Sequence, residues 1–254
     1  MTFARETWIV FTRSMRLGFR EPVWLFIALS QPILYLALFG PLLEKVVEAT
    51  PDLPPGDAWQ VFVPGLLVQL GLFGTVFVGF GLVAEYRAGV IERMRVTPAS
   101  RAALLVGRVL RDVVVLVVQA TLLTLVSVPF GLRAPVGGVV VALVLVAALG
   151  AAFSALSYAA ALVLKTEDAL ASVLNSLAVP VLLLSGILLP MTLAPTWLRT
   201  VSDANPLKHV VDAVRSLFQG EVTTSATGWG VASAVGLVVV GLYVGTRTFR
   251  RESA

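Results

Sequence analysis

The chain has 254 residues, of which 57% are hydrophobic and only 13% charged, and its net charge is +4. A water-soluble domain of this composition would have to expose large apolar patches, so the composition excludes an ordinary soluble protein and indicates a membrane protein. Cysteine is absent from the sequence, which excludes disulfides, thiolate metal sites and cysteine nucleophiles.

Six apolar runs without Asp, Glu, Lys, Arg or His carry most of the hydrophobic residues. They occupy residues 22–43, 58–84, 113–132, 134–164, 169–198 and 222–246. Each can cross a bilayer as a helix, because about 20 residues rising about 1.5 Å each span about 30 Å of hydrocarbon. The sequence therefore predicts an all-α polytopic membrane protein with one transmembrane domain over residues 1–254 and spans near 22–43, 61–84, 113–132, 136–164, 169–189 and 228–247.

Residues 1–21 are expected to form an amphipathic helix on the cytoplasmic leaflet. At 100° per residue, apolar side chains share one broad face and arginines gather on the other. The apolar face holds Phe3, Trp8, Phe11, Met15 and Phe19, and the basic face holds Arg5, Arg13, Arg16 and Arg20. The simplest role is a membrane anchor, and the alternative is a relay of motion from a partner.

The basic residues sort by loop. Most of the 19 lysines and arginines lie before the first span, in the loops after the second and fourth spans, or after the sixth. The five on the other side are Lys45, Arg133, Arg199, Lys208 and Arg215. The positive-inside rule therefore predicts a multi-pass protein with both termini in the cytoplasm. The preference for Arg over Lys indicates a high-GC bacterial genome, and hence a bacterial inner membrane.

The cytoplasmic loop of residues 85–112 is the most charged part of the chain. Val90, Ile91 and Met94 form a short apolar stripe, and Glu92 and Arg93 face away from it. A small apolar patch flanked by both charge signs is typical of a docking surface for another protein.

The same loop leads into the third span. Thr97 followed by Pro98 predicts the N-cap and first turn of a new helix. On this helix Arg101, Arg108 and Arg111 share one side, where they are expected to reach lipid phosphates.

The segment of residues 190–220 is expected on the outer side as re-entrant or amphipathic helices. Asn205 and Pro206 begin a helical pattern that ends at Gly220. Its polar face is predicted to hold Lys208, His209, Asp212, Arg215 and Gln219, opposite Leu207, Val210, Val211, Val214, Leu217 and Phe218. Ser185 and Gly186, in a tract bounded by prolines, predict a break near the outer end of the fifth span.

Three blocks of the chain resemble the membrane permeases of ABC type-2 exporters, especially the bacterial drug-resistance branch that includes the daunorubicin permease. The blocks are Glu85, Gly89, Ile91, Glu92 and Arg93 with residues 97–101; residues 185–187 with Pro190, Pro195 and Trp197; and residues 205–213 with Arg215 and Gly220. The likeness covers essentially the whole chain in span number, loop lengths and topology.

The resemblance implies export of a hydrophobic or amphipathic drug, antibiotic, lipid or glycan. It implies a dimer, with itself or a paralogous permease, that works with two copies of a separate ATP-binding subunit holding ATP and Mg. It assigns coupling to the ATPase to Val90, Ile91, Glu92, Arg93 and Met94. It assigns the external gate to Ser185, Gly186, Pro190, Asn205 and Pro206.

The chain itself is expected to be a transport permease and not an enzyme. No G-x-x-x-x-G-K-[ST] phosphate loop occurs in it, so ATP hydrolysis requires another chain. No bound cofactor, metal or nucleic acid is expected. Cargo contacts are expected from polar or aromatic residues inside spans, namely Gln69, Phe73, Phe77 and Asn175.

An ion-coupled secondary transporter is the alternative. Proton coupling usually needs an ionisable residue inside the membrane, at about 2.5–3.5 kcal/mol on insertion scales, and the apolar runs contain none. Sodium sites built from carbonyls and hydroxyls stay open. A membrane enzyme would need a cluster of acids or histidines, whereas the single histidine, His209, lies beside Asp212 and Arg215 and is expected to be solvated or paired.

Overall fold

The computed structural model describes residues 2–18, 30, 33–38, 58–89, 100–187 and 191–252, and within these ranges its regular structure is helical, without strands. The helices are α1 (Phe3–Gly18), α3 (Ala58–Val76), α4 (Gly79–Arg87), α6 (Arg101–Ser127), α7 (Val136–Leu164), α8 (Glu167–Leu183), the 3-10 turn η1 (Met191–Leu193), α9 (Thr196–Asp203), α10 (Pro206–Phe218) and α11 (Ser225–Glu252).

Four stretches of the described chain are long and apolar enough to cross a membrane. They are Trp59–Arg87, formed by α3 and α4 together, Arg101–Ser127, Val136–Leu164 and Ser225–Arg251. The first expected span, residues 22–43, lies mostly outside the described residues. The fifth corresponds to α8, which has 17 residues and ends at Leu183. These helices are those of a multi-pass membrane protein.

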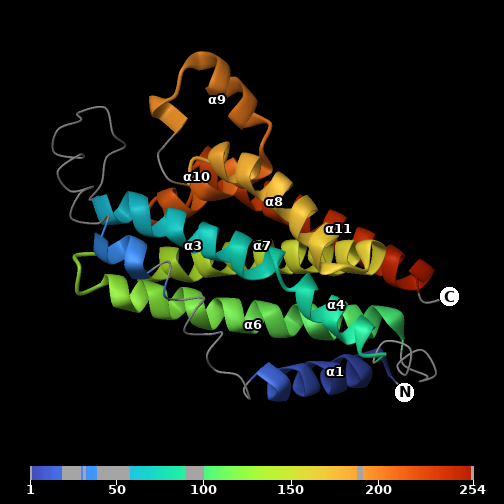
Figure 1. Cartoon of the computed structure of the whole chain (residues 1–254). Coiled ribbons are helices and arrows are strands. Elements are labelled where there is room, and N and C mark those ends of the chain that lie inside the picture. Colours follow the sequence, from blue (N-terminus) through green and yellow to red (C-terminus); the bar gives the residue numbers. More distant parts are fainter. Residues whose placement is uncertain are drawn as a thin grey trace.

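The long helices run side by side, and the two ends of their bundle differ (Figure 1). Both termini lie at one end, while α9 and α10 lie at the other. We call the end with the termini the inner end and the end with α9 and α10 the outer end, after the topology that the sequence predicts.

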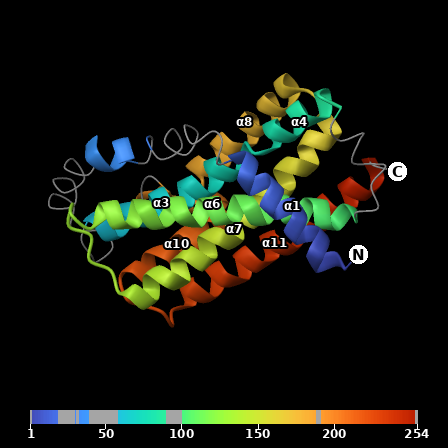
Figure 2. The same cartoon turned by 90° about the horizontal axis from the view of Figure 1, so that it is seen from below.

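Helix α7 is the centre of the bundle. It packs against α3, α4, α6, α8, α10 and α11, and Figure 2 shows it between α6 and α11. The approach is close because the facing residues are small: a Cβ on Gly150 would lie 2.4 Å from Cδ2 of Leu116, and one on Gly241 of α11 would lie 2.7 Å from the carbonyl oxygen of Ala152. Small residues at helix contacts are what holds helices together in lipid.

Helix α1 packs on α6, and its apolar residues on the other side are exposed. A Cβ on Gly107 of α6 would lie 2.7 Å from Cβ of Val10, so the two backbones meet closely. The carboxylate of Glu6 accepts a hydrogen bond of 2.9 Å from the N–H of Ser100, next to the start of α6. Trp8 points away from this contact and is exposed. The amphipathic helix is therefore bound to α6 through Val10, which packs on Gly107, and through the carboxylate of Glu6.

The start of α6 differs from the sequence prediction. Ser100, not Thr97, is its N-cap, and the Ser100 hydroxyl accepts a hydrogen bond of 3.2 Å from the N–H of Ala103. The prediction failed because two acceptors, the Ser100 hydroxyl and the Glu6 carboxylate, satisfy N–H groups at this position.

The prediction that Arg108 reaches lipid phosphates is also wrong, because Arg108 is buried and pairs with Glu85 of α4 at 2.5 Å. Arg111 pairs with Asp112 at 2.8 Å and its side chain is 31% exposed, so its contact with lipid stays a prediction. Asp112 is only 3% exposed and accepts a hydrogen bond of 2.6 Å from the Tyr158 hydroxyl of α7. An acid therefore lies inside a membrane-length helix, where the charge-free runs predicted none, because Tyr158 of α7 and the neighbouring Arg111 of α6 satisfy it.

Candidate functional site

The second expected span is broken near its middle. α3 ends at Val76 and α4 begins at Gly79, with Phe77 and Val78 in a turn. Ser157 of α7 bridges the break: its Oγ accepts from the Gly79 N–H at 2.9 Å and donates to the Val76 carbonyl at 2.5 Å. A broken helix is tolerated in a membrane where a neighbouring side chain satisfies its backbone groups, so the break is a stable joint.

An aromatic face crosses this joint. The rings of Phe73 and Phe77 stack with centroids 6.2 Å apart, and Phe77 stacks on Phe80 at 6.0 Å. All three side chains are half-buried, and Gly74 and Gly81 beside them are exposed. Stacked rings beside open glycines form a surface against which an apolar, flat molecule can pack.

The four residues expected to contact cargo do not form one cluster. The two phenylalanines lie on the aromatic face, whereas Gln69 is buried inside the bundle, with its side-chain oxygen unpartnered within the described residues. Asn175 lies on the exposed side of α8, away from the buried face formed by Leu170, Leu174 and Ala178. The joint therefore has an aromatic exterior, with a polar amide deeper in the same helix.

Side chains link α4 to its neighbours at the inner end. Besides the pair between Glu85 and Arg108, Arg87 pairs with Glu167 of α8 at 3.3 Å. The helix gives way to a turn at Gly89, whose φ of 68° is left-handed. The residues that the resemblance assigns to coupling, Val90–Met94, follow directly and lie outside the described residues. α4 therefore connects that segment to the joint at Ser157.

At the outer end α8, the helix of the fifth expected span, ends where the sequence predicts a break. α8 ends at Leu183, and Gly186 follows in a turn with a left-handed φ of 72°. The hydroxyl of Ser185 accepts a hydrogen bond of 3.3 Å from the Ile187 N–H and so closes the turn. Pro190, the third residue of this part of the expected gate, lies outside the described residues.

The other expected gate residues begin α10 and contact α8. Asn205 is the N-cap of α10: its Oδ1 accepts from the Leu207 N–H at 3.0 Å, and Pro206 occupies the first turn. The same side chain donates to the carbonyl of Val181 in α8 at 3.0 Å. Gly220, with φ 90°, follows the helix as the sequence predicts. The structure thus brings Ser185, Gly186, Asn205 and Pro206 together at the outer end.

Arg215 of α10 is part of the same cluster. Its guanidinium donates to the carbonyls of Val61 in α3 at 3.1 Å, Gly186 at 2.8 Å and Ile187 at 3.2 Å. It is 6% exposed. Desolvation lowers the pKa of the guanidinium to about 10, so it remains cationic at neutral pH.

The sequence pattern predicted Arg215 on the polar face of its helix, and this prediction is wrong. The arginine lies four residues after Val211 and three before Phe218, both buried, so it shares their side of the helix. That spacing is the signal that could have found it. The periodicity of one helix does not reveal that two other segments bring carbonyls to this side.

The solvated side of α9 and α10 is charged. Lys208 pairs with Asp203, which lowers the pKa of that carboxyl, whereas burial raises the pKa of Asp212. His209 contacts the Asp203 carbonyl through Nε2 at 3.0 Å, and its ring lies 6.0 Å from that of Trp229. No group of three or more His, Cys, Asp or Glu side chains that could hold a metal occurs in the described part of the chain.

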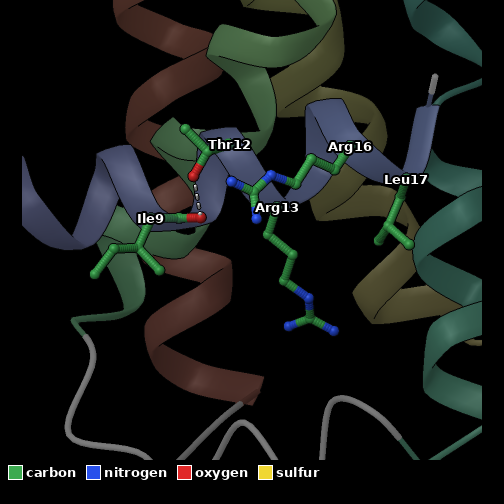
Figure 3. A pocket seen from close by; sticks show the side chains of 5 residues that line it. All are labelled: Ile9, Thr12, Arg13, Arg16 and Leu17. Carbon is green, nitrogen blue, oxygen red and sulfur yellow. Dashed lines mark hydrogen bonds between the residues drawn. The ribbon is translucent and has the colours of Figure 1, made fainter.

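A shallow hollow of about 300 Å³ lies along α1 and is lined by Ile9, Thr12, Arg13, Arg16 and Leu17. Figure 3 shows both arginine side chains reaching into it between Ile9 and Leu17. Guanidinium groups beside exposed aliphatic side chains suit the anionic surface of a membrane, which is where the sequence places this helix.

Comparison with known proteins agrees with this architecture. Residues 5–218 match the family model of the ABC-2 type transporter. The chain is 27% identical to the daunorubicin resistance ABC transporter permease protein DrrB1 of Streptomyces coeruleorubidus over 92% of its own length and 82% of that protein. It is 28% identical to the putative transport permease ycf38 of Cyanophora paradoxa over 85% and 75% of the two chains. The chain therefore belongs to the ABC-2 type transporter family and is a membrane permease of an ABC transporter.

Proposed function

We propose that the chain is the membrane subunit of an ATP-driven exporter that moves an amphipathic aromatic compound out of the cell. The observation that carries the proposal is the stacked, half-exposed face of Phe73, Phe77 and Phe80 across the joint of a broken span. One relative is named a daunorubicin resistance ABC transporter permease, which supports a drug-like cargo.

The working assembly in this proposal has two copies of the chain and two ABC ATP-binding subunits, which hydrolyse ATP. Each copy has six spans, with both termini in the cytoplasm of a bacterial cell. The placement of both termini at one end of the bundle supports an even number of spans (Figure 1). The ATP-binding subunit docks on Val90–Met94, next to the end of α4.

Transport then follows from motion of α4. ATP binding draws the two partner subunits together and displaces the docked segment, and α4 tilts about the joint at Ser157. The aromatic face is reshaped because it crosses that joint. Such a shift requires that ATP-bound partner subunits bind one arrangement of α4 more tightly than the other.

The first experiment purifies the tagged chain with its ATP-binding subunit and measures ATP hydrolysis and daunorubicin uptake into inverted vesicles. Reversing the charges with Glu92→Arg and Arg93→Glu should leave hydrolysis and abolish uptake, whereas Arg250→Glu near the C-terminus should change neither. Solute movement by the purified chain alone, without ATP, would instead establish the ion-coupled carrier.

The aromatic face has its own test. Phe77→Leu removes a ring from the middle of the stack while keeping an apolar side chain, and should raise the KM for daunorubicin with little change in maximal ATP hydrolysis. Phe130→Leu, in the exposed outer turn after α6, is the matched control and should leave KM unchanged. An equal KM for both variants would remove the aromatic face from the transport path.

A further inference from the structure

The outer end contains a buried cation, Arg215, that has no role in the proposed transport mechanism. We propose that Arg215 is the positioning residue of the outer gate, joining α3, the turn of residues 185–187 and α10 into one unit so that the gate moves with the second span. This inference rests on the proposed export function.

The three hydrogen bonds of Arg215 reach two segments that are far apart in the sequence. Nε donates to Val61 of α3 at 3.1 Å, while Nη2 donates to Gly186 at 2.8 Å and to Ile187 at 3.2 Å. Only a planar guanidinium presents donors in several fixed directions, so one side chain can bind both segments at once. The arginine therefore connects three elements through main-chain atoms, which cannot rotate away as side chains can.

The charge of Arg215 is satisfied by these carbonyls. No carboxylate within the described residues forms an ion pair with it, and the carboxylate that acts on it electrostatically is Asp212 on the same helix. The turn follows the C-terminal end of α8, where carbonyl groups carry the partial negative charge of the helix. A buried cation at this place is bound most strongly when the turn stays closed on α3.

Glycine allows the turn to touch α3 directly. A Cβ on Gly65 would lie 2.4 Å from the Ile187 carbonyl oxygen and 3.7 Å from Nη2 of Arg215. There is consequently no gap between α3 and the turn into which the gate could slide independently. Displacement of α3 must displace Gly186 and Ile187 with it.

A second bond fixes the other side of the turn. Asn205, at the start of α10, donates to the carbonyl of Val181 at 3.0 Å, before the turn, while Arg215 holds Gly186 and Ile187 within it. Two residues of the α10 segment therefore bind the chain on either side of the end of α8: Asn205 binds Val181, and Arg215 binds Gly186 and Ile187. Because Arg215 also binds α3, and α3 continues through the joint to α4, a continuous connection runs from the coupling segment to the gate.

The experiment separates this role from simple stabilisation. Arg215→Lys keeps the positive charge but loses the planar set of guanidinium donors, and Arg215→Gln loses both the charge and these donors. If the glutamine variant does not fold, the lysine variant alone tests the inference. Arg199→Lys is the matched control, since Arg199 also donates to main-chain carbonyls, of Thr192 and Ala194, but within its own exposed segment. All variants are purified with the ATP-binding subunit.

Two readouts are taken from each variant. The first is daunorubicin transported per ATP hydrolysed. The second is the distance distribution between spin labels at Leu183→Cys and Val222→Cys, which are 60% and 46% exposed in the native chain. Because the chain has no cysteine of its own, only these positions are labelled, and labelled copies are diluted with unlabelled ones.

The expected result is a drop of about tenfold or more in transport per ATP for both Arg215 variants, because charge-assisted hydrogen bonds are lost. ATP hydrolysis should be retained and the distance distribution should broaden, while Arg199→Lys behaves as wild type. Proportional loss of hydrolysis and transport, or unchanged distances, would overturn the inference. If the unsubstituted complex does not export, the proposed function fails, and the distances still test whether Arg215 holds the gate.

Discussion

At the inner end of the bundle, helices are joined by pairs of charged side chains, whereas at the outer end they are joined by side chains that bind main-chain carbonyls. Inside, Glu85 pairs with Arg108, and Arg87 pairs with Glu167. Outside, Arg215 and Asn205 donate to carbonyls of α3 and α8. The two kinds of bond differ in how easily they are exchanged.

The pair of Arg87 and Glu167 is exposed and the carboxylate of Glu85 is partly exposed, so water and salt can replace part of the attraction that is lost when these pairs break. A buried cation on carbonyls has no such replacement, since the groups left behind would be unsatisfied in an apolar environment. In the proposed export cycle the inner end therefore rearranges when the ATP-binding subunit moves, and the outer end moves as one body. Substitutions that weaken one end or the other should therefore differ in the size of their effect.

The largest loss of stability should come from adding a methyl group where α3 touches the outer turn of residues 185–187. Gly65→Ala would place a Cβ 2.4 Å from the Ile187 carbonyl oxygen, a main-chain atom that cannot give way cheaply. Overpacking of this kind costs about 1–3 kcal/mol, and we expect a value near the top of that range. Gly81→Ala, where nothing lies within 4 Å, is the control and should be neutral or slightly stabilising. The free energy of unfolding in mixed micelles distinguishes the two.

The second largest loss of stability is expected at the joint between α3 and α4. Ser157→Ala removes both hydrogen bonds that bridge α3 and α4, and we expect a loss of about 1–3 kcal/mol because two buried backbone groups lose their partner. Ser154→Ala, one turn earlier in α7, is the control, since that hydroxyl is buried without a partner in the described structure. Equal stability of the two variants would show that the joint does not depend on Ser157.

Local signals in the sequence were enough for the outer helix and the broken fifth span. The N-cap at Asn205, the glycine stop at Gly220 and the turn at Gly186 are set by residues within a few positions of each other. The environment of Arg215 and Asp112 was not accessible in this way, because carbonyls of α3 or a hydroxyl of α7 reach them from distant parts of the chain. Val90–Met94 and Pro190 stay predictions.

The inner ion pairs should respond less and should depend on salt. Glu85→Gln leaves the buried Arg108 without its charged partner, and we expect a loss of about 1 kcal/mol at low ionic strength because the glutamine oxygen can still accept its hydrogen bond and the Glu85 side chain is 30% exposed to water. Arg87→Gln tests the pair with Glu167, whose side chains are 54% and 47% exposed, and should cost less still. If Glu85→Gln loses the same stability in high salt, the pair of Glu85 and Arg108 is not screened by salt, and it then resembles the buried contacts of Arg215 with carbonyls.

The smallest effect is expected from the charged surface of the outer end, and its sign depends on the residue. The hydrogen bond from Lys208 lowers the pKa of Asp203 below its ordinary 3.8, so the ionised carboxylate stabilises the fold above that pH and the contribution is lost as the pH falls through the lowered value. Asp212 behaves oppositely: burial raises its pKa, so its ionisation destabilises the fold as the pH rises from 3.8 through the raised value.

Unfolding midpoints of Asp203→Asn and Asp212→Asn, measured from pH 3 to 7 relative to wild type, should therefore diverge in opposite directions as the pH rises. Asp203→Asn should become relatively less stable, because only the native chain gains the ionised pair with Lys208. Asp212→Asn should become relatively more stable, because the asparagine carries no charge into the half-buried site. Parallel curves would mean that neither carboxylate senses its neighbours, and that the charged surface of the outer end does not contribute to its stability between pH 3 and 7.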